Sequence, residues 1–386
     1  MATDYYGIND SLSEDEKNIR DEVQKWVGKN YLPIIKDCFE KDRFPREIIP
    51  QLAQLGLLGI KTQGYGCPGA SNMVYGLVCQ ELERGDSGLR SFVSVTNSLV
   101  MYPIETFGSE EQKNFWLPKL ASGEKIGCFG LTEPDAGSDP ASMKTTAKKD
   151  GENYILNGTK MWITNGSIAD VAIVWAKTQK GIRGFLVEKG MEGFSAVDIK
   201  GKMSLRASVT SELILDNVAV PEKNMLPKAE GLKAILMCLN EARYGIAWGA
   251  LGAAIECYEI ALNYTKQRKQ FGKPIASFQL VQKSLVEMLT EITKGQLLAL
   301  QLGRLEDEGK ERHQQISMAK MNNVYHALKI ARDARDLLGA NGIHLDHRIV
   351  RHMMNLEAVS TYEGTHNIHL LIIGKDITGI SAFGNE

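Results

Sequence analysis

The residue of this chain best suited to acid–base chemistry is Glu363, which stands in the segment Tyr362-Glu-Gly-Thr365 near the end of a helical region. A carboxylate that is partly removed from water has a raised pKa, and this makes it a stronger base. An isolated glutamate on a helix is more often a solvated surface group. From its residue type alone, Glu363 is therefore only a candidate base.

A second set of polar residues gathers in a loop that could bind a planar ligand. The segment Phe129-Gly-Leu-Thr-Glu-Pro-Asp-Ala-Gly-Ser-Asp139 combines hydroxyl groups, carboxylates and small residues. Its backbone N–H groups and hydroxyls could hydrogen-bond an uncharged heteroaromatic ring such as a flavin. The same composition is typical of an ordinary turn with Asx and Ser/Thr bonds, and chemistry alone favours that simpler interpretation.

Three further patterns carry less information. Residues 64–69 match G-x-G-x-x-G, but their flanks are helical and a proline lies inside the motif, which indicates a glycine-rich turn rather than a nicotinamide site. His366 and His369 share one helix face without a further ligand, so no metal is predicted. The six cysteines form no C-x-x-C pair and are expected to be small buried hydrophobes.

The elements that must position these residues form three segments. Apolar residues recur at helical spacing from Ser13 to about Leu120, where Ser13/Glu16 and Ser109/Gln112 are capping boxes that predict helix starts. Short β-rich runs follow up to about Val220, with Asp150-Gly151 and Asn-Gly pairs at 157–158 and 165–166 expected as hairpin turns. Helical periodicity then returns, mainly over 231–266, 279–308 and 313–338.

These periods predict an α+β chain of three domains. We expect an all-α domain over 1–126, a β domain over 127–228 and a four-helix-bundle domain over 229–386. The β-rich runs lack long helical crossovers, so an antiparallel barrel or sandwich is expected. A β domain between two helical domains leaves clefts at its junctions, where ligand sites preferentially form.

Composition excludes several classes of partner. The net charge of −2 has mixed signs along the chain and predicts no binding of nucleic acid. No apolar run approaches the ~20 residues that span a bilayer, so no membrane insertion is expected. The first residues resemble no targeting segment and favour a cytoplasmic location, or the mitochondrial matrix if a transit peptide has been removed.

Four motifs occur together, and their combination resembles the acyl-CoA dehydrogenase family over nearly the whole chain. They are the loop at 129–139, Lys160-Met-Trp-Ile-Thr-Asn-Gly166, Arg268-Lys-Gln-Phe-Gly272 and Tyr362-Glu-Gly-Thr365. The resemblance implies FAD as cofactor, an acyl-CoA thioester as substrate, electron transfer flavoprotein as oxidant and a homotetramer that shares its FAD sites. It implies Glu363 as the base that removes the α-proton.

The same resemblance implies roles for other residues. The positions expected to contact the flavin are Leu131, Thr132, Trp162 and Thr164. Those expected to hold the rest of FAD, partly from a neighbouring subunit, are Arg268, Phe271, Leu338, Gly339, Gly342, Thr365 and Asn367. An arginine suits a pyrophosphate because its guanidinium donates paired hydrogen bonds. Ser138 is expected along the acyl-CoA path, and Arg243 among the substrate-binding residues.

Within the family, several stretches resemble the glutaryl-CoA dehydrogenases, among them Leu89-Arg-Ser91, Leu205-Arg-Ala-Ser208, Ala242–Trp248 and Asn355-Leu-Glu-Ala-Val359. The resemblance implies that Arg90 binds the second carboxylate of glutaryl-CoA, with Ser91 and Glu83 nearby and Tyr362 beside the base. Because decarboxylating members carry this glutamate and tyrosine, the expected reaction gives crotonyl-CoA and carbon dioxide.

Other functions stay open on the sequence. They are a non-decarboxylating glutaryl-CoA dehydrogenase, a dehydrogenase of monocarboxylic acyl groups, an acyl-CoA oxidase and an inactive assembly protein. The last is disfavoured by the intact Glu363.

Overall fold

Helices form the first third of the chain in the computed structural model, which describes residues 3–383. Both predicted capping boxes are confirmed, since the Ser13 and Ser109 side chains accept from the backbone N–H groups of Glu16 and Gln112. A π-helical segment, Val95–Met101, continues α5. The helices are α1 (Glu14–Trp26), α2 (Leu32–Glu40), α3 (Ile49–Gln54), α4 (Asn72–Gly85), α5 (Ser87–Ser94), α6 (Tyr102–Phe107) and α7 (Glu110–Ala121).

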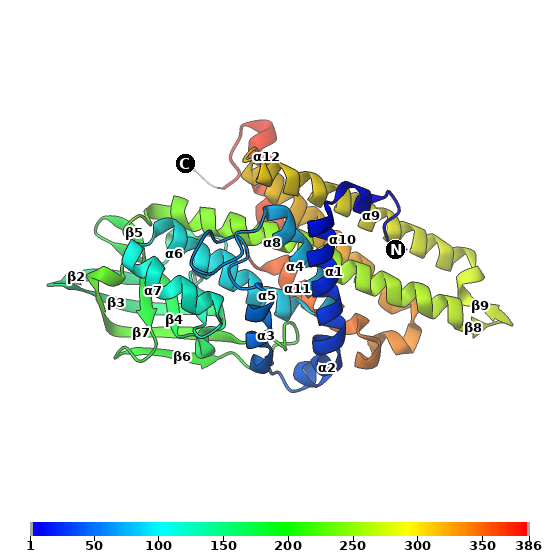
Figure 1. The fold of residues 1–386 in the computed structure, drawn as a ribbon, viewed down its shortest axis with the longest axis horizontal. Helices are drawn as coiled ribbons and strands as arrows, with labels where there is room; N and C mark the ends of the chain where they lie inside the picture. Colours follow the sequence, from blue (N-terminus) through cyan, green and yellow to red (C-terminus); the bar gives the residue numbers. More distant parts are fainter. Residues whose placement is uncertain (1–2, 384–386) are drawn as a thin grey trace.

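A twisted sheet follows and lies at one end of the elongated molecule (Figure 1). Its strands are β1 (Gly127–Gly130), β2 (Thr146–Asp150), β3 (Asn153–Thr164), β4 (Val171–Thr178), β5 (Gly181–Glu188), β6 (Phe194–Asp198) and β7 (Thr210–Pro221). The order is β1-β4-β2-β3-β7-β6, and β5 pairs with β4. The predicted antiparallel pairing is confirmed for β2–β3, β3–β7, β4–β5 and β6–β7, but it is wrong for β1 and β2 against β4, since both run parallel to β4. The chain returns to β4 through the β2–β3 hairpin, so the parallel β1–β4 pair needs no helical crossover.

Two predicted hairpin turns are also wrong. Asn165-Gly166 begins the 3-10 segment Gly166–Ile168 and makes no hairpin, because the flanking strands β3 and β4 do not pair with each other. Asn157-Gly158 makes no hairpin but lies inside the long strand β3, where the register with β7 shifts between Leu156 and Gly158. Gly158 has φ 151°, and a Cβ there would lie 2.8 Å from the Cα of Thr145. The glycine therefore marks a bulge and a close backbone approach rather than a chain reversal. Asp150-Gly151 does form the β2–β3 hairpin.

The C-terminal third is a bundle built around α10, which contacts α8, α9, α11 and α12. Its helices are α8 (Gly231–Gln267), α9 (Gln279–Asp307), α10 (His313–Leu337), α11 (Ile349–Thr361) and α12 (His366–Thr378). The first three agree closely with the ranges expected from periodicity. Between α8 and α9 the short strands β8 (Lys269–Gln270) and β9 (Lys273–Pro274) form a hairpin at the far end of the molecule from the sheet (Figure 1). The predicted order of helices, strands and helices is confirmed.

Close packing of α4 on α8 fixes the centre of the molecule. Gly249 and Gly252 on α8 face α4, and a Cβ at Gly252 would overlap the backbone carbonyl of Gln80. A Cβ at Gly249 would overlap the Glu83 carboxylate. The two glycines therefore let α4 approach closely and bring Glu83 against α8.

Among residues 3–383, α8 is the one helix long and apolar enough to cross a membrane by length and composition. Within its most apolar stretch, 83% of the residues are buried in the structure. Its apolar character is therefore explained by its place in the core.

Candidate active site

Glu363 lies at a sharp corner between two helices. Helix α11 ends at Thr361, and α12 begins at His366 after Thr365, whose side chain accepts from the backbone N–H of Ile368 at 3.3 Å. Glu363 itself has φ 53°, in the left-handed region that side chains other than glycine rarely adopt. Such strained residues cluster at functional sites, where the surrounding structure holds them.

Two buried cations hold the backbone of this corner. Lys320 Nζ on α10 donates to the carbonyls of Tyr362 at 2.9 Å and Gly364 at 2.7 Å. Arg243 Nε on α8 donates to the carbonyl of Glu363 at 2.9 Å. Three successive carbonyls after the C-terminal end of α11 thus accept from cations. Positive charge at this end also interacts favourably with the negative end of the α11 helix dipole.

The environment of the Glu363 carboxyl raises its pKa and so strengthens it as a base. Burial raises its pKa, although Arg90, Lys320 and Arg243 oppose that rise. Its Oε2 atom is shielded from solvent and has no hydrogen-bond partner among the residues described. Nearby, burial lowers the pKa of His369 to about 2, so this side chain is neutral. A shielded carboxyl without fixed partners has the properties of a general base that acts on a bound ligand.

Arg90 forms a second buried cluster beside this corner. It is 1% exposed, and its Nε donates to Glu83 Oε2 at 2.6 Å, while Glu83 Oε1 accepts from Ser87 Oγ at 2.8 Å. Arg90 Nη2 donates to the Tyr362 hydroxyl, which also lies 3.5 Å from Ser91 Oγ. Burial alone would lower the pKa of Arg90, but Glu83 more than offsets this and raises it. Burial raises the pKa of Tyr362 to about 12, so its hydroxyl stays protonated. The structure therefore brings Glu83, Arg90, Ser91 and Tyr362 together next to Glu363.

The predicted flavin loop is tied to β3 by a buried ion pair. Lys160 Nζ donates to the Leu131 carbonyl at 3.1 Å and to Glu133 Oε1 at 2.8 Å. The backbone N–H of Met161 donates to the Thr132 carbonyl at 2.8 Å. Leu131 and Thr132 are thereby held beside the strand that carries Trp162 and Thr164. Burial lowers the pKa of Lys160 to about 8, against the opposing effect of Glu133.

Trp162 has an unusual exposed position in this strand. Its φ is 63°, it sits where the β3–β7 register shifts between Lys160 and Ile163, and 57% of its surface is exposed. A bulge of this kind re-aims a side chain. An exposed aromatic ring beside a polar loop offers a stacking surface for a planar ligand.

The remaining predicted residues lie elsewhere within the chain. Phe271, at the tip of the β8–β9 hairpin, is 92% exposed, and Arg268 is exposed at its base. Leu338 and Gly342 are buried and Gly339 is exposed in the turn after α10, while Ser138 and Asn367 are exposed and Thr365 caps α12. Within one chain, the β8–β9 hairpin lies at the far end of the molecule from the sheet whose strands β1 and β3 flank the flavin loop (Figure 1).

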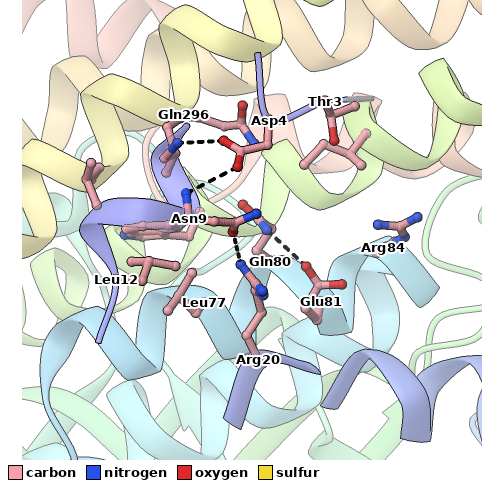
Figure 2. Close-up of a pocket in the computed structure, with 14 residues that line it drawn as sticks. Thr3, Asp4, Asn9, Leu12, Arg20, Leu77, Gln80, Glu81, Arg84 and Gln296 are labelled. Carbon is pink, nitrogen blue, oxygen red and sulfur yellow. Dashed lines mark hydrogen bonds between the residues drawn. The ribbon is translucent and has the colours of Figure 1, made fainter. Parts of the chain in front are cut away.

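A small cavity near the N-terminus lies apart from all these residues (Figure 2). Its volume is about 40 Å³, and its lining includes Asp4, Arg20, Glu81 and Gln296. Arg20 donates to Asn9, and Gln80 Nε2 donates to Glu81 Oε1 at 2.9 Å. Such a volume has room for about one water molecule, so it cannot hold a thioester or a dinucleotide.

Comparison with known proteins agrees with this geometry. The chain matches the family models of the acyl-CoA dehydrogenase N-terminal domain over residues 13–124, the middle domain over 128–218 and the C-terminal domain over 229–378. An acyl-CoA dehydrogenase of Bacillus subtilis is 37% identical over 375 residues, which cover 95% of this chain and 99% of the relative. The chain belongs to the acyl-CoA dehydrogenase family.

Solved structures of this family lie close to the present one. A glutaryl-CoA dehydrogenase from Mycobacterium smegmatis superposes with a TM-score of 0.98 at 56% identity, covering 99% of each chain. A glutaryl-CoA dehydrogenase of the same organism in complex with FADH2 gives a TM-score of 0.98 at 54% identity, again over 99% of each chain. The resemblance expected from the four motifs is therefore confirmed.

FAD is the cofactor of this acyl-CoA dehydrogenase, as the family and the FADH2 complex of its relative indicate. The residues present fit a flavin: the exposed Trp162 ring offers a stacking face, and the Leu131–Glu133 loop is held beside it by Lys160. The exposed Phe271 ring would suit a second contact.

Sequence reasoning missed three polar residues of this acyl-CoA dehydrogenase site. Lys320 follows Ile316 and Ala319 and precedes Asn323 and Val324, so it lies on the buried face of α10. A lysine at a core-facing position of a helical stripe was the available indication. Lys160 and Glu133 were hidden among strand and turn residues, and their pairing depends on the tertiary fold.

Proposed function

We propose that this acyl-CoA dehydrogenase oxidises and decarboxylates glutaryl-CoA to crotonyl-CoA and carbon dioxide. The observation that carries the proposal is the buried Arg90 beside Tyr362 and next to the base. A fully buried cation is costly unless it serves a partner or a ligand. Glu83 accepts from Nε and the Tyr362 hydroxyl accepts from Nη2, and the remaining N–H groups of the guanidinium can donate to a carboxylate at the end of an acyl chain.

The residues divide the proposed reaction between them. Glu363 removes the α-proton of the thioester, and FAD when bound supplies the acceptor for the β-hydride. The carbon–carbon bond to the second carboxylate then breaks, and its electron pair enters a dienolate delocalised onto the thioester oxygen. Glu363 returns its proton to the γ-carbon, which completes crotonyl-CoA.

Glu83 supports the decarboxylation step through charge. Because Glu83 partly neutralises Arg90, the guanidinium orients the substrate carboxylate without binding it as tightly as a lone buried cation would. The Tyr362 hydroxyl, protonated by virtue of its raised pKa, shares the same guanidinium. This arrangement holds the carboxylate in place while leaving it able to depart as neutral carbon dioxide.

We further propose electron transfer flavoprotein as the oxidant and a homotetramer as the working assembly. The support for the assembly is the separation of the β8–β9 hairpin from the flavin loop within one chain (Figure 1). A neighbouring copy could bring Phe271 and Arg268 to the FAD that Trp162 contacts.

The test is an anaerobic titration of the FAD-loaded protein with glutaryl-CoA, in which flavin absorbance is followed and the thioester product is identified by mass spectrometry. Bleaching with crotonyl-CoA as product supports the proposal. Bleaching with glutaconyl-CoA overturns the decarboxylation and keeps the dehydrogenation. Bleaching by butyryl-CoA but not by glutaryl-CoA overturns the assignment of the substrate.

Arg90→Met tests the role of the buried cation. We expect the KM for glutaryl-CoA to rise about 10- to 100-fold, since a charged hydrogen bond is lost, while butyryl-CoA is much less affected. The matched control is Arg84→Met, which removes an arginine paired with Glu256 and Glu259 rather than with Tyr362. Equal losses for both substrates in Arg90→Met would contradict the carboxylate role.

A further inference from the structure

Lys320 has a place in the structure that neither the family motifs nor the proposed reaction explains. It is 1% exposed on α10, and its Nζ atom bonds the two carbonyls on either side of Glu363. It has no salt bridge to a carboxylate among the residues described. Burial lowers the pKa of Lys320 to about 7, against the opposing charge of Glu363, so this ammonium is fully charged only below that pH. Keeping a charge at a site where desolvation is so costly needs a function that offsets the cost.

We propose that Lys320 is a positioning residue for the base: by bonding the Tyr362 and Gly364 carbonyls it fixes the left-handed backbone of Glu363, and its charge favours the ionised carboxylate. Lys320 acts through Glu363 and needs no contact with the substrate. The proposal rests on the proposed role of Glu363 as general base, but not on the identity of the acyl group.

The backbone argument starts from the φ of 53° at Glu363. A non-glycine residue in this region is strained by about 1–3 kcal/mol and persists only when neighbouring contacts hold it. The Tyr362 carbonyl belongs to the peptide group that precedes Glu363, the Gly364 carbonyl belongs to the peptide group one residue beyond it, and both accept from one atom of a third segment. Releasing that atom would leave the bond from Arg243 Nε to the Glu363 carbonyl and would let the corner relax toward ordinary backbone angles.

The charge argument depends on every ionisable group that faces the corner. These are Arg243 from α8, Arg90 from α5, Glu83 from α4, His369 from α12, the Tyr362 hydroxyl and Glu363 itself. Arg90, Lys320 and Arg243 all lower the pKa of Glu363, and Arg90 has the largest effect of the three, whereas His369 is neutral. Arg90 also pairs with Glu83, while Lys320 has no salt bridge to a carboxylate among residues 3–383, so part of the charge that balances the ionised base comes from Lys320. Removing Lys320 would therefore favour the protonated, inactive form of Glu363.

The test compares Lys320→Gln and Lys320→Arg in the FAD-loaded protein. Gln can still donate to backbone carbonyls but carries no charge, and Arg keeps the charge. The matched control is Lys329→Gln on the same helix, where the lysine forms an exposed pair with Asp333. For each protein we would measure FAD content, Tm, the Kd for crotonyl-CoA and the anaerobic rate of flavin reduction from pH 6 to 9. The acyl-CoA used is whichever one bleaches the unmodified protein.

We expect Lys320→Gln to keep its binding of FAD and crotonyl-CoA. Its rate of flavin reduction at pH 7 should fall by about tenfold or more, and the pH at which the rate rises should move upward. Lys320→Arg should restore most of the rate and the original profile, and Lys329→Gln should match the unmodified protein. If Lys320→Gln loses FAD, the pH profile of Lys320→Arg tests the proposal instead. Because arginine keeps the charge, a shifted pH profile in Lys320→Arg would overturn the proposal.

Two other outcomes overturn the role of Lys320. One is an unchanged rate and profile in Lys320→Gln. The other is a loss of rate that follows only the loss of FAD and Tm, with the pH profile unchanged. Failure of every acyl-CoA to bleach the unmodified protein would instead contradict the proposed dehydrogenase activity, so the two failures are distinguishable.

Discussion

At the scale of single residues, the active corner combines a shielded carboxyl with cations that have different partners. Arg90 is matched by Glu83 before any ligand arrives, whereas Glu363 Oε2 has no hydrogen-bond donor among residues 3–383. Because Arg90 is paired with Glu83, its buried charge has a partner and the pocket stays folded. A buried carboxyl without a hydrogen-bond donor is more reactive, but it lowers the free energy of unfolding. Substitutions at Glu363 should therefore change activity and stability in opposite directions.

The first prediction concerns activity. Glu363→Gln should retain FAD and bind acyl-CoA, because the amide has nearly the same shape, but flavin reduction should slow by about 10²- to 10⁴-fold through loss of the base. Rapid-mixing absorbance under anaerobic conditions measures this. Persistent fast bleaching would show that another group removes the proton.

The second prediction concerns stability and pH. Burial raises the folded-state pKa of Glu363 above its ordinary value of 4.5. The stability due to this group is therefore full below pH 4.5 and is lost as pH rises through the folded pKa. Glu363→Gln has no such loss, so its Tm advantage over the unmodified protein should grow between pH 5 and pH 8. A constant difference in Tm across this range would contradict the raised pKa.

At the scale of elements, the approach of α4 to α8 holds Glu83 and Arg90 in place. Gly252→Ala should destabilise the protein by about 1–3 kcal/mol, because the new methyl would meet the backbone carbonyl of Gln80, which cannot move alone. The matched control is Gly374→Ala on α12, where nothing lies within 4 Å of the added Cβ. Alanine favours helix there, so the control should be neutral or stabilising. Thermal unfolding at one pH compares the two, and equal effects would contradict the close packing.

The elements also show what a sequence can and cannot predict. Helices α9 and α10 could be located from periodicity because each keeps one apolar face over many turns, whereas α8 could be located because its middle is apolar on every side where it crosses the core. The Asn157-Gly158 pair has the letters of a hairpin turn, but pairing of β3 with β7 overrides them. Lys320 and the Glu133–Lys160 pair depend on contacts across 27 to 44 residues of chain, which local patterns do not encode.

At the scale of the whole molecule, the residues predicted to contact the cofactor belong to two elements that lie far apart, the sheet and the β8–β9 hairpin. Trp162 belongs to the sheet, and Phe271 to the hairpin at the opposite end (Figure 1). The family resemblance identifies both groups of residues and implies a site shared between subunits. The fold adds how far apart the two groups lie within one chain.

A prediction about FAD binding follows from this separation. Phe271→Ala should weaken FAD binding about 2- to 10-fold, as expected for one lost aromatic contact, while the Tm of the FAD-free protein stays unchanged. The matched control is Phe115→Ala, another exposed ring, which packs on Trp116. Flavin fluorescence during reconstitution gives the Kd, and its dependence on protein concentration reports whether the site is shared. An unchanged Kd in Phe271→Ala would contradict a contribution of the hairpin.

The buried Glu83–Arg90 pair and the clamped Glu363 corner are both rigid, and together they act as a molecular ruler. With the proposed substrate, one end of the acyl chain is held at the guanidinium and the other must present its α-carbon to the base. A dicarboxylic chain one methylene shorter or longer cannot satisfy both fixed points at once, since neither can shift without breaking buried hydrogen bonds. We therefore expect succinyl-CoA and adipyl-CoA to bind yet turn over poorly.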